Sequence, residues 1–527
     1  MTQTIVIGGG VAGLATAALL AREGHDVLLL EQLDRFGGRV GSLDRDGFRF
    51  DTGPSWYLMP SVFEHFFSLL GSSAAAELDL RDLDPAYRVF SEPNSDGTQH
   101  GPVTIPRGKE RVLKTFAAVE EGSEIALEKY LASARKTTVM AERFFLYNTF
   151  TKARSLMNRH VLGSLPTLVQ LLTTPLDKYV AKRFQHPVLR QILGYPAVFL
   201  GTDPSAAPAL YHLMSALDLD EGVQYPMGGF TAIVSRLEEL ARAEGAVLAT
   251  GAKVLEITTD RVNNSKKPMV TGVRWRDSEG QTHFSAAQIV VSGADLHHTE
   301  TELLHGTDQS YPEHWWKKQT SGPGAVLVLL GIRGSLPKLP HHTLLFTKDW
   351  QANFSAIFGS NPAIPDPASI YVCKPSATDP DVAPDGHENL FVLVPVPADS
   401  TIGTGGPDGT GSPRIEEVAD RVIDQIAQWT GTADLRERIV VRHTIGPTDF
   451  ANDYHSWQGG MLGPAHTLRQ SAMFRPQNAS KRVHGLYYAG ATTAPGVGVP
   501  MCLISAELVL KRIRGDHSAG PTQPRVR

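Results

Sequence analysis

Apolar residues along the chain recur with two periods, one typical of strands and one typical of helices. Near the N-terminus, TIVIGGG passes from β-branched residues into glycine, and VAGLATAALLAREG follows with apolar residues at helical spacing. The segment HDVLLLE is then typical of a second strand. The first 31 residues therefore predict a strand, a tight turn, a helix and a strand.

Similar patterns return later in the chain. GGFTAIVSRLEELARAEG predicts a helix, and TGAKVLEI (250–257) predicts a strand that returns to the same sheet. AAQIVVSGADLHHTETELL predicts the strand that closes this lobe, while GAVLVLLGI and LFVLVPVP predict buried strands of another sheet. PMCLISAELVLKRI predicts a helix starting at Pro500, since proline lacks only an N–H that the first helical turn leaves unpaired.

The first predicted turn carries glycines in the register G-x-G-x-x-G. Gly8 allows the turn, Gly10 lets a pyrophosphate approach the backbone, and Gly13 lets helix and strand pack closely. Glu31 follows 18 residues after Gly13, where a carboxylate accepts hydrogen bonds from a ribose. The alternative, a glycine-rich turn that binds nothing, explains neither the second strand nor the acid. The candidate phosphate-binding residues at this helix N-terminus are Gly8, Gly10, Val11, Ala12 and Gly13.

A second glycine pair indicates whether the chain binds a nicotinamide or a flavin dinucleotide. Gly37 and Gly38 precede Arg39, an arrangement for which a nicotinamide enzyme has no need. The run LDRFGGRVGSLDRDGFRFDTGPSW resembles the motif of the flavin amine oxidase and desaturase superfamily. The resemblance implies that Arg39 and neighbouring backbone hold the FAD pyrophosphate, whereas the alternative is a solvated surface charge. It also implies that the backbone of Val254 meets the adenine. The resemblance adds five residues to the candidate cofactor-binding set, namely Gly38, Arg39, Gly53, Pro54 and Val254.

Close to the C-terminus, LYYAGATTAPGVGVPMCLISAEL joins a strand to a helix through a bridge of small residues. Free N–H groups near Gly498 and Val499 would face any group that approaches the start of that helix. If this group is the flavin ring, they would stabilise the anionic reduced form by about 0.3–1 kcal/mol. The alternative is a simple strand-to-helix turn. The candidate flavin-contacting residues are Gly490, Ala491, Gly498 and Val499.

GLYYAGATTAPGVGVP resembles the C-terminal flavin signature of bacterial-type carotenoid (phytoene) desaturases. LPHHTLLFTKDWQANFSAIF, IYVCKPSATDPDVAPDGHENLFVLVPVP and GVQYPMGGFTAIV also resemble that family, although Met501 stands where many relatives carry a smaller residue. The resemblance implies an α/β fold with a discontinuous FAD-binding Rossmann-like domain, a mixed-sheet substrate domain and a helical membrane-facing part. The expected ranges are 1–90, 225–300 and 470–515 for the FAD-binding domain, 91–224 and 301–469 for the substrate domain, and 516–527 for a disordered tail.

Composition narrows the choice of partners. The 527 residues carry a formal net charge of −5, which argues against a nucleic-acid binder. Cys373 and Cys502 lack metal-ligand spacing and form no disulfide framework, which fits a cytoplasmic location. No apolar run reaches the roughly 18 residues of a membrane span.

Residues 151–193 are basic and apolar, which favours peripheral contact with anionic lipid; a helical pair with a solvated basic face is the alternative. Their basic residues are Lys152, Arg154, Arg159, Lys178, Lys182, Arg183 and Arg190.

The resemblance further implies removal of two hydrogens beside a polyene, one as hydride to flavin N5 and one as a proton. The expected conversion is phytoene towards lycopene, with oxygen or a quinone as electron acceptor. Such a polyisoprenoid must come from a membrane, because each CH₂ exposed to water costs about 0.8 kcal/mol. The alternatives are a C30 diapophytoene desaturase, a flavin-dependent carotenoid isomerase and a ketolase-like polyene oxidase. His341, His342 and Asp379 are candidate bases, for which a structural role is the alternative; none is assigned.

Overall fold

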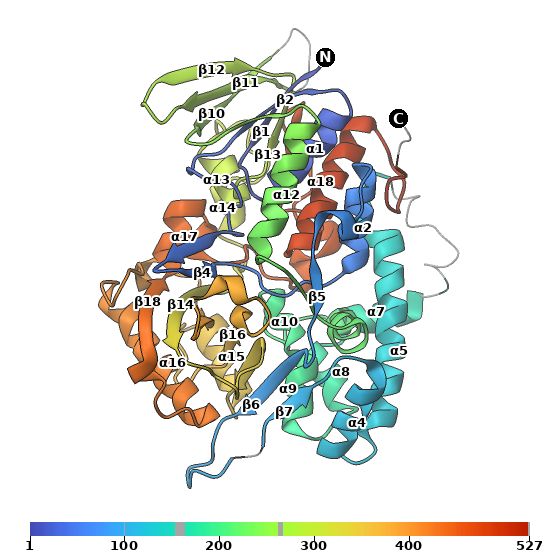
Figure 1. The fold of residues 1–527 in the computed structure, drawn as a ribbon. Helices are drawn as coiled ribbons and strands as arrows, with labels where there is room; N and C mark the ends of the chain where they lie inside the picture. Colours follow the sequence, from blue (N-terminus) through green and yellow to red (C-terminus); the bar gives the residue numbers. More distant parts are fainter. Residues whose placement is uncertain (100, 153–162, 164, 262–266, 525–527) are drawn as a thin grey trace.

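The structure is a computed structural model, which describes residues 1–99, 101–152, 163, 165–261 and 267–524. It has two lobes, arranged one above the other in Figure 1. The upper lobe contains both chain termini and a five-stranded sheet, and the lower lobe is built around a seven-stranded sheet. None of the described helices has the length and apolar character needed to cross a membrane.

The upper sheet has the strand order β19-β13-β1-β2-β9, and all of its strands are parallel. Segments far apart in the sequence therefore lie side by side, and the last strand joins the sheet next to β13. The predicted strand–helix–strand at the N-terminus and the closing strand are confirmed. The strands are β1 (Gln3–Ile7), β2 (Asp26–Leu30), β9 (Val247–Ala249), β13 (Ile289–Ser292) and β19 (Leu486–Tyr488).

Three long helices accompany this sheet (Figure 1). α1 packs against the other two, and every residue from Val11 to Ala21 is buried. Its alanines and glycine allow this close packing, since a helix that is apolar all round lies inside the protein. The predicted C-terminal helix is confirmed, with Pro500 as its second residue. The helices are α1 (Val11–Arg22), α12 (Phe230–Ala243) and α18 (Val499–Arg514).

The segment 250–257 does not return to the parallel sheet, contrary to the sequence-based expectation. The short β9 makes that return, and Gly251, whose φ is +65°, turns the chain away after it. The following strand buries only Val254 and Ile257 and is otherwise partly or fully exposed, which suits an antiparallel sheet with one face in water. This separate sheet consists of β10 (Lys253–Asp260), β11 (Met269–Arg276) and β12 (Thr282–Ala286).

The seven-stranded sheet has the order β18-β14-β17-β16-β15-β6-β7, and its β15–β6 pair is parallel while the other pairs are antiparallel. The two predicted buried strands are confirmed as its long central strands. The sheet is therefore mixed, as expected. Its strands are β6 (Tyr87–Ser91), β7 (Val103–Ile105), β14 (Gly324–Arg333), β15 (His342–Phe346), β16 (Ile370–Cys373), β17 (His387–Val396) and β18 (Ile439–Ile445).

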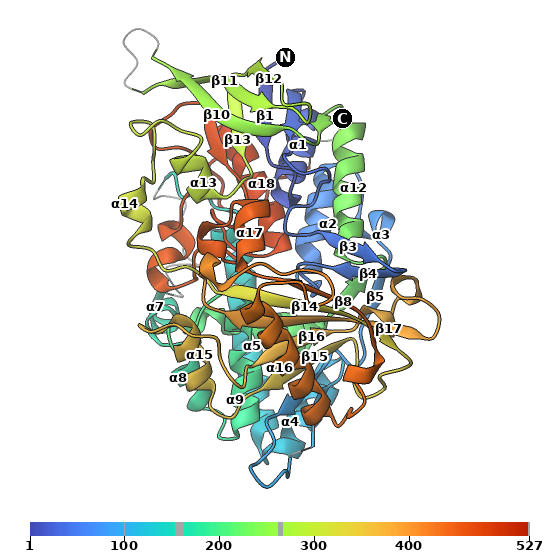
Figure 2. The ribbon, with the colours of Figure 1, turned by 90° about the vertical axis from the view of Figure 1, so that its left-hand side faces the viewer.

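Alternation along β17 separates the two faces of this sheet. Leu390, Val392 and Val394 belong to a core shared with the long helix α16 (Pro413–Thr430), which covers one face (Figure 2). Phe391 and Leu393 point to the opposite face, where they border a cavity. The helices of the lower lobe around this sheet are α4 (Lys109–Val119), α5 (Ser123–Ala141), α7 (Leu165–Thr173), α8 (Leu176–Ala181), α9 (Pro187–Gly194), α10 (Pro196–Phe199), α11 (Met214–Ala216) and α15 (Trp350–Phe358).

Smaller elements complete the chain and connect the lobes. The hairpin of β3 (Ser42–Arg45) and β4 (Phe48–Asp51) leads from the glycine turns towards the lower lobe. A second pair, β5 (Leu80–Asp82) and β8 (Gln224–Pro226), links distant parts of the sequence. The remaining helices are α2 (Pro60–Leu69), α3 (Ala74–Glu77), α13 (Leu296–Thr301), α14 (Glu313–Trp316) and α17 (Pro447–Tyr454).

Two ends of the expected domains differ in the structure. β6 begins at Tyr87 in the lower sheet, so the chain leaves the upper lobe before the expected boundary at residue 90. Residues 516–524, expected to be disordered, lie against α18 instead. The Lys511 ammonium donates to the carbonyls of Ser518 and Gly520, and the Thr522 N–H donates to Glu507. The tail is polar, but these hydrogen bonds to the buried side chains of Lys511 and Glu507 hold it in place. Residues 525–527 lie outside the described part.

Candidate active site

The turn after β1 places backbone N–H groups at the carboxyl edge of the upper sheet. Gly8 has a φ of +90°, and a Cβ on Gly13 would lie 1.9 Å from the Gly8 carbonyl oxygen, so helix and turn meet without side chains. Gly10 is the N-cap of α1 and provides no side-chain cap, and the first helical turn has no acidic residue. Its leading N–H groups, from Val11 and Ala12, therefore suit an anion.

Glu31 lies beside this turn at the end of β2. Its carboxylate accepts hydrogen bonds from the N–H of Gly9 at 2.6 Å and of Leu33 at 2.8 Å. Burial raises the pKa of Glu31, while these two backbone N–H groups act in the opposite direction. A carboxylate has further lone pairs that can accept ribose hydroxyls. The buried Val254 is close in the chain to Ala252, whose N–H donates to the Glu31 carbonyl at 2.7 Å.

The second glycine pair packs directly on the first turn. The Gly37 N–H donates to the Gly9 carbonyl at 2.9 Å, and a Cβ on Gly38 would lie 3.4 Å from the Cα of Gly10. A Cβ on Gly53 would lie 2.0 Å from the Arg39 carbonyl oxygen, which brings the following Pro54 to the same place. The two glycine segments and the β4 arm thus form one cradle of bare backbone.

Arg39 reaches from this cradle into the cavity described below. Its guanidinium donates to the Ser456 hydroxyl at 2.7 Å and lies 3.5 Å from the Asp295 carboxylate. Its Nε is buried and has no hydrogen-bond partner among the described residues. A half-buried guanidinium with an unused, buried Nε donor beside an uncapped helix N-terminus fits a pyrophosphate, so the residues present match the dinucleotide that the sequence predicts.

The C-terminal bridge meets the N-terminal helix at the same site. A Cβ on Gly490 would lie 3.7 Å from the Ala12 Cβ, and the Gly490 N–H donates to the Ser505 hydroxyl at 3.0 Å. Gly498 has a φ of +119° and is the N-cap of α18, again without a side-chain cap or an acid in the first turn. Val499 starts this helix. The cavity is bordered by Ala491, Gly498 and Val499.

Arg475 holds this bridge and was not predicted from the sequence, where a lone arginine gives no signal. It is fully buried, and its guanidinium donates to the carbonyls of Thr493 at 3.1 Å and Ala491 at 2.7 Å. Burial lowers the pKa of Arg475 to about 10. A cation surrounded by carbonyl oxygens fixes the bridge without a counter-charge of its own.

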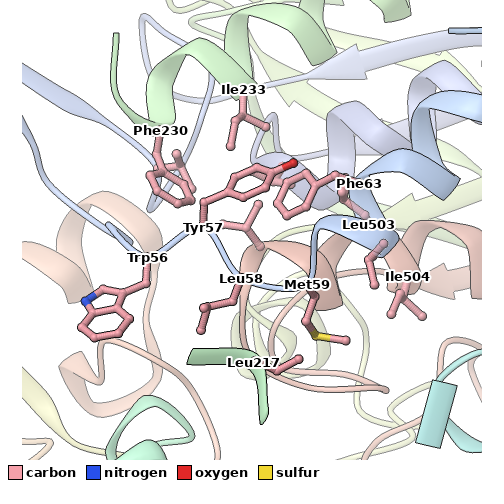
Figure 3. Close-up of a cluster of buried hydrophobic side chains, with 14 of the residues drawn as sticks. Trp56, Tyr57, Leu58, Met59, Phe63, Leu217, Phe230, Ile233, Leu503 and Ile504 are labelled. Atoms are coloured by element: carbon pink, nitrogen blue, oxygen red, sulfur yellow. The ribbon is translucent and has the colours of Figure 1, made fainter. Parts of the chain in front are cut away.

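A cavity of about 680 Å³ joins the two lobes. Its upper wall consists of part of the cradle and of the bridge, including Arg39, Gly53 and Pro54, whereas Gly10 and Gly38 do not border it. Its lower wall is apolar and comes from the seven-stranded sheet and from α5, α7 and α15. Trp56 and Leu58 border it, while the intervening Tyr57 points into the core between α2, α12 and α18 (Figure 3). This alternation lets one strand-like segment serve both the core and the cavity.

The three candidate bases lie behind the cavity wall. Asp379 accepts hydrogen bonds from the Gly228 N–H at 2.8 Å and the Tyr225 hydroxyl at 3.3 Å, which gives it a structural role. His342, the first residue of β15, and His341, which directly precedes that strand, are buried and do not border the cavity. His342 nevertheless connects to it, because its Nδ1 lies 2.8 Å from the Tyr371 hydroxyl on the cavity wall.

Asp51 ends the β4 arm and caps α12. Its carboxylate accepts from the Phe230 N–H at 2.8 Å, and burial raises its pKa from 3.8 to about 7. Because the folded-state pKa lies above the unfolded value, folding binds a proton at this group, and the contribution of Asp51 to stability falls as the pH rises from about 4 to 7. The difference amounts to about 4 kcal/mol. Other buried groups titrate over the same range in both proteins, so the comparison between them isolates Asp51. We expect the unfolding free energy of Asp51→Asn, relative to that of the wild type, to rise by roughly 3 kcal/mol between pH 4.5 and 7.5, as measured by denaturant unfolding.

The control for this experiment is Asp44→Asn, which removes an exposed carboxylate from the neighbouring strand of the same hairpin. This variant should keep the wild-type pH dependence. An Asp51→Asn protein with the same pH dependence as the wild type would show that Asp51 does not titrate with a raised pKa.

Comparison with known proteins places the chain in a family. Residues 11–513 match the family described as flavin containing amine oxidoreductase. The chain belongs to this family. It is therefore an FAD-dependent oxidoreductase, consistent with the cradle and its unused arginine donor.

Individual relatives agree over nearly the whole chain. A carotenoid 3,4-desaturase from Haloarcula japonica is 41% identical over 502 residues, which cover 95% of this chain and 96% of the relative. A zeta-carotene-forming phytoene desaturase from Myxococcus xanthus is 33% identical, with 97% and 93% covered. Among solved structures, an oxidoreductase from Methanosarcina mazei is similar with a TM-score of 0.60 at 15% identity, covering 97% of this chain and all of that one. The similarity to this solved structure shows the fold alone.

Proposed function

We propose that this protein is a carotenoid desaturase that introduces C=C bonds into a long polyisoprenoid taken from a membrane surface. The observation that carries the proposal is the cavity between the lobes, whose upper wall is the cofactor cradle and whose remaining wall is almost wholly apolar. A hydrocarbon substrate needs such a lining, because it offers no polar group for recognition. The names of the Haloarcula and Myxococcus relatives support the same class of substrate.

In this proposal the upper lobe holds FAD and the lower lobe holds the hydrocarbon. Bound FAD supplies the hydride acceptor. The uncapped N-terminus of α18, at Gly498 and Val499, stabilises negative charge close to its first turn. The apolar wall excludes water and orients the chain of the substrate. The residues proposed to hold the cofactor are Gly8, Gly10, Val11, Ala12, Gly13, Glu31, Gly38, Arg39, Gly53, Pro54, Val254, Gly490, Ala491, Gly498 and Val499.

Phytoene, converted towards lycopene, is the first substrate to test. The 41% identity to the Haloarcula enzyme favours a second candidate, the 3,4-desaturation of a carotenoid that is already conjugated. A C30 substrate is a third, since diapophytoene desaturases of Staphylococcus match at 28–29% identity. Oxygen or a quinone would reoxidise the cofactor.

The cavity reaches the surface at a rim of exposed apolar residues. Two come from α7, which lies in the basic segment 151–193, and three come from a loop that the sequence did not single out. Such a rim suits lipid, because apolar side chains and a neighbouring Arg469 match the interior and the anionic surface of a bilayer. Arg154 and Arg159 of the basic segment lie outside the described residues. The exposed rim residues are Leu165, Val169, Leu468, Met473 and Phe474.

Phe474→Ser should weaken binding to anionic liposomes about tenfold, because it removes the insertion of a phenyl ring worth roughly 1.5–3 kcal/mol when fully buried. Phe474 is 62% exposed. Co-sedimentation with phosphatidylglycerol vesicles measures the partition. The matched control is Phe284→Ser, which alters a 57% exposed phenylalanine on β12, away from the cavity. Equal binding of Phe474→Ser and wild-type protein would argue against this rim as the membrane contact.

The function is tested with purified protein and FAD in liposomes that contain phytoene or lycopene, under air or with a quinone. We expect products that have lost two hydrogens for each new double bond, visible by mass and by a longer absorption wavelength. A product of unchanged mass would identify an isomerase, and added oxygen would identify an oxidase. Unaltered carotenoids under every condition would remove the proposal. In cells, we expect the protein in the cytoplasm, attached peripherally to the membrane.

A further inference from the structure

A hydrogen-bonded chain leads from the cavity into the lower lobe. The Ser55 hydroxyl and the Tyr371 hydroxyl are 2.6 Å apart, and the Tyr371 hydroxyl is 2.8 Å from Nδ1 of His342. Ser55 and Tyr371 both border the cavity, and Ser55 directly follows Pro54 of the cofactor cradle. The chain therefore begins at the place where cofactor and substrate would meet.

The second half of this chain leads outward through His341. Its Nδ1 lies 2.8 Å from the hydroxyl of Thr378, which is only half-buried. Nε2 of His341 and Nε2 of His342 are both buried and have no hydrogen-bond partner within the described part of the chain. One ring nitrogen of each histidine lies within 4.8 Å of the other, a separation short enough for a single intervening water molecule.

The surrounding structure fixes these side chains in place. Adjacent strands carry them, since His342 on β15 pairs with Cys373 on β16. Trp56 stacks on His342 with ring centroids 4.7 Å apart and an interplanar angle of 15°. Tyr225 packs against His341 at 4.6 Å. Burial lowers the pKa of His341 to about 3, and burial also lowers that of His342, so both rings are neutral near pH 7 and each keeps one unprotonated ring nitrogen as an acceptor.

We propose that Ser55, Tyr371, His342, His341 and Thr378 form a proton exit path from the cavity to solvent. The inference rests on the proposed desaturation, which leaves one proton in an apolar space. As one C–H bond gives its hydride to FAD, the neighbouring C–H bond gives its electron pair to the new C=C bond and its proton to the Ser55 oxygen. The Ser55 hydroxyl proton passes to Tyr371, and the Tyr371 hydroxyl proton passes to His342 Nδ1. His342 then releases its Nε2 proton through one water molecule to Nε2 of His341. His341 gives its Nδ1 proton to the Thr378 hydroxyl, which releases a proton to solvent.

The same cluster could instead hold a metal ion, because the Cys373 sulfur lies within 4.8 Å of a nitrogen from each histidine. Burial, however, raises the pKa of the Cys373 thiol to about 12. A metal ion would have to displace this tightly held thiol proton, which disfavours a metal site here. The structure also shows one hydrogen bond at Nδ1 of each histidine. The proton path uses both of these bonds, whereas a metal ion bound at Nε2 would leave them without a function.

The decisive variant is Tyr371→Phe, which interrupts the path and preserves the ring. We expect anaerobic reduction of bound flavin by carotenoid to slow about 10²-fold. Flavin content and the visible spectrum should stay as in the wild type. His342→Asn, whose amide can still accept from Tyr371 but cannot carry the proton, should slow the reaction similarly. In His341→Asn, the release of the proton, followed with a pH indicator, should lag behind flavin reduction, which a structural role would not cause.

The control is Tyr87→Phe. Tyr87 is another buried tyrosine of the same sheet, and its hydroxyl donates to Asp218 at 2.9 Å outside the path. This variant should react at the wild-type rate. A Tyr371→Phe protein that reduces its flavin within threefold of the wild type would overturn the path, as would stoichiometric metal in the purified protein.

A measurement independent of turnover separates failure of the path from failure of the proposed function. In protein labelled with ¹⁵N-histidine, the signal lost in His342→Asn identifies His342. Tyr371→Phe should shift the Nδ1 resonance of that ring, because it removes the hydrogen bond. An unshifted resonance contradicts the path even if no carotenoid reacts, whereas a shifted resonance without any desaturation contradicts only the function.

Discussion

Gly10→Ala is expected to lower the affinity for FAD by at least about 100-fold while the chain remains folded. Gly10 has a φ of −71°, which alanine adopts freely, and a Cβ there would meet nothing closer than the Gly37 carbonyl oxygen at 3.8 Å. The protein therefore has room for the methyl group. A pyrophosphate resting on this backbone does not, because the methyl group would separate it from the N–H groups of α1. A 100-fold change corresponds to about 2.8 kcal/mol.

Two further glycine variants serve as controls for this experiment. Gly306→Ala, at an exposed position with open space around it, should bind FAD normally. Gly13→Ala should instead damage the fold, since its Cβ would lie 1.9 Å from the Gly8 carbonyl oxygen. Titration of the apoprotein with FAD gives the affinity, and thermal unfolding gives the stability. If Gly10→Ala binds FAD as tightly as the wild type, the cofactor does not lie on this turn.

Leu393→Asp is expected to reduce carotenoid turnover more than 100-fold and to leave FAD bound. Leu393 points from β17 into the cavity, on the face opposite to the core shared with α16. An ionised carboxylate at this position is hydrated. A bound hydrocarbon would displace that water, and desolvating the charge costs several kcal/mol. The cofactor cradle belongs to other elements and should be unaffected. Product formation in liposomes and the flavin absorbance of the purified protein measure the two effects.

Leu393→Met is the control for the cavity, because it keeps both volume and apolar character and should retain most of the activity. Val440→Asp is the control for the new charge, since Val440 lies on β18 of the same sheet and is 48% exposed to solvent. Normal turnover by Leu393→Asp would place the substrate elsewhere.

Local patterns accounted for much of the upper lobe. The spacing of Gly8, Gly10 and Gly13 and the position of Glu31 predicted the first turn, because this turn, its helix and both strands are contiguous in the sequence. The position of Pro500 in the first turn of α18 followed from the same kind of local rule. The expectation for 250–257 was wrong because a strand pattern does not state which sheet the strand joins, and Gly251 redirected it.

Other features depended on residues that are distant in the sequence. The rim combines α7 with the loop that contains Phe474, and neither segment is recognisable alone as part of an opening. Arg475 gains its role only through the carbonyl oxygens that surround it. The sequence offered His342 as a candidate base, but its link to the cavity requires Ser55 and Tyr371, which lie 316 residues apart.

The sequence by itself determined the dinucleotide turn, the family resemblance and the central strands, because hydrophobic period and glycine spacing act over a few neighbouring residues. Only the tertiary structure decided which apolar faces turn away from the core to enclose a cavity, and which buried polar groups join across strands. Those outcomes follow from the pairing of β15, β16 and β17 and from the packing of the two lobes. Both depend on contacts between distant segments, whose free energies no local pattern contains.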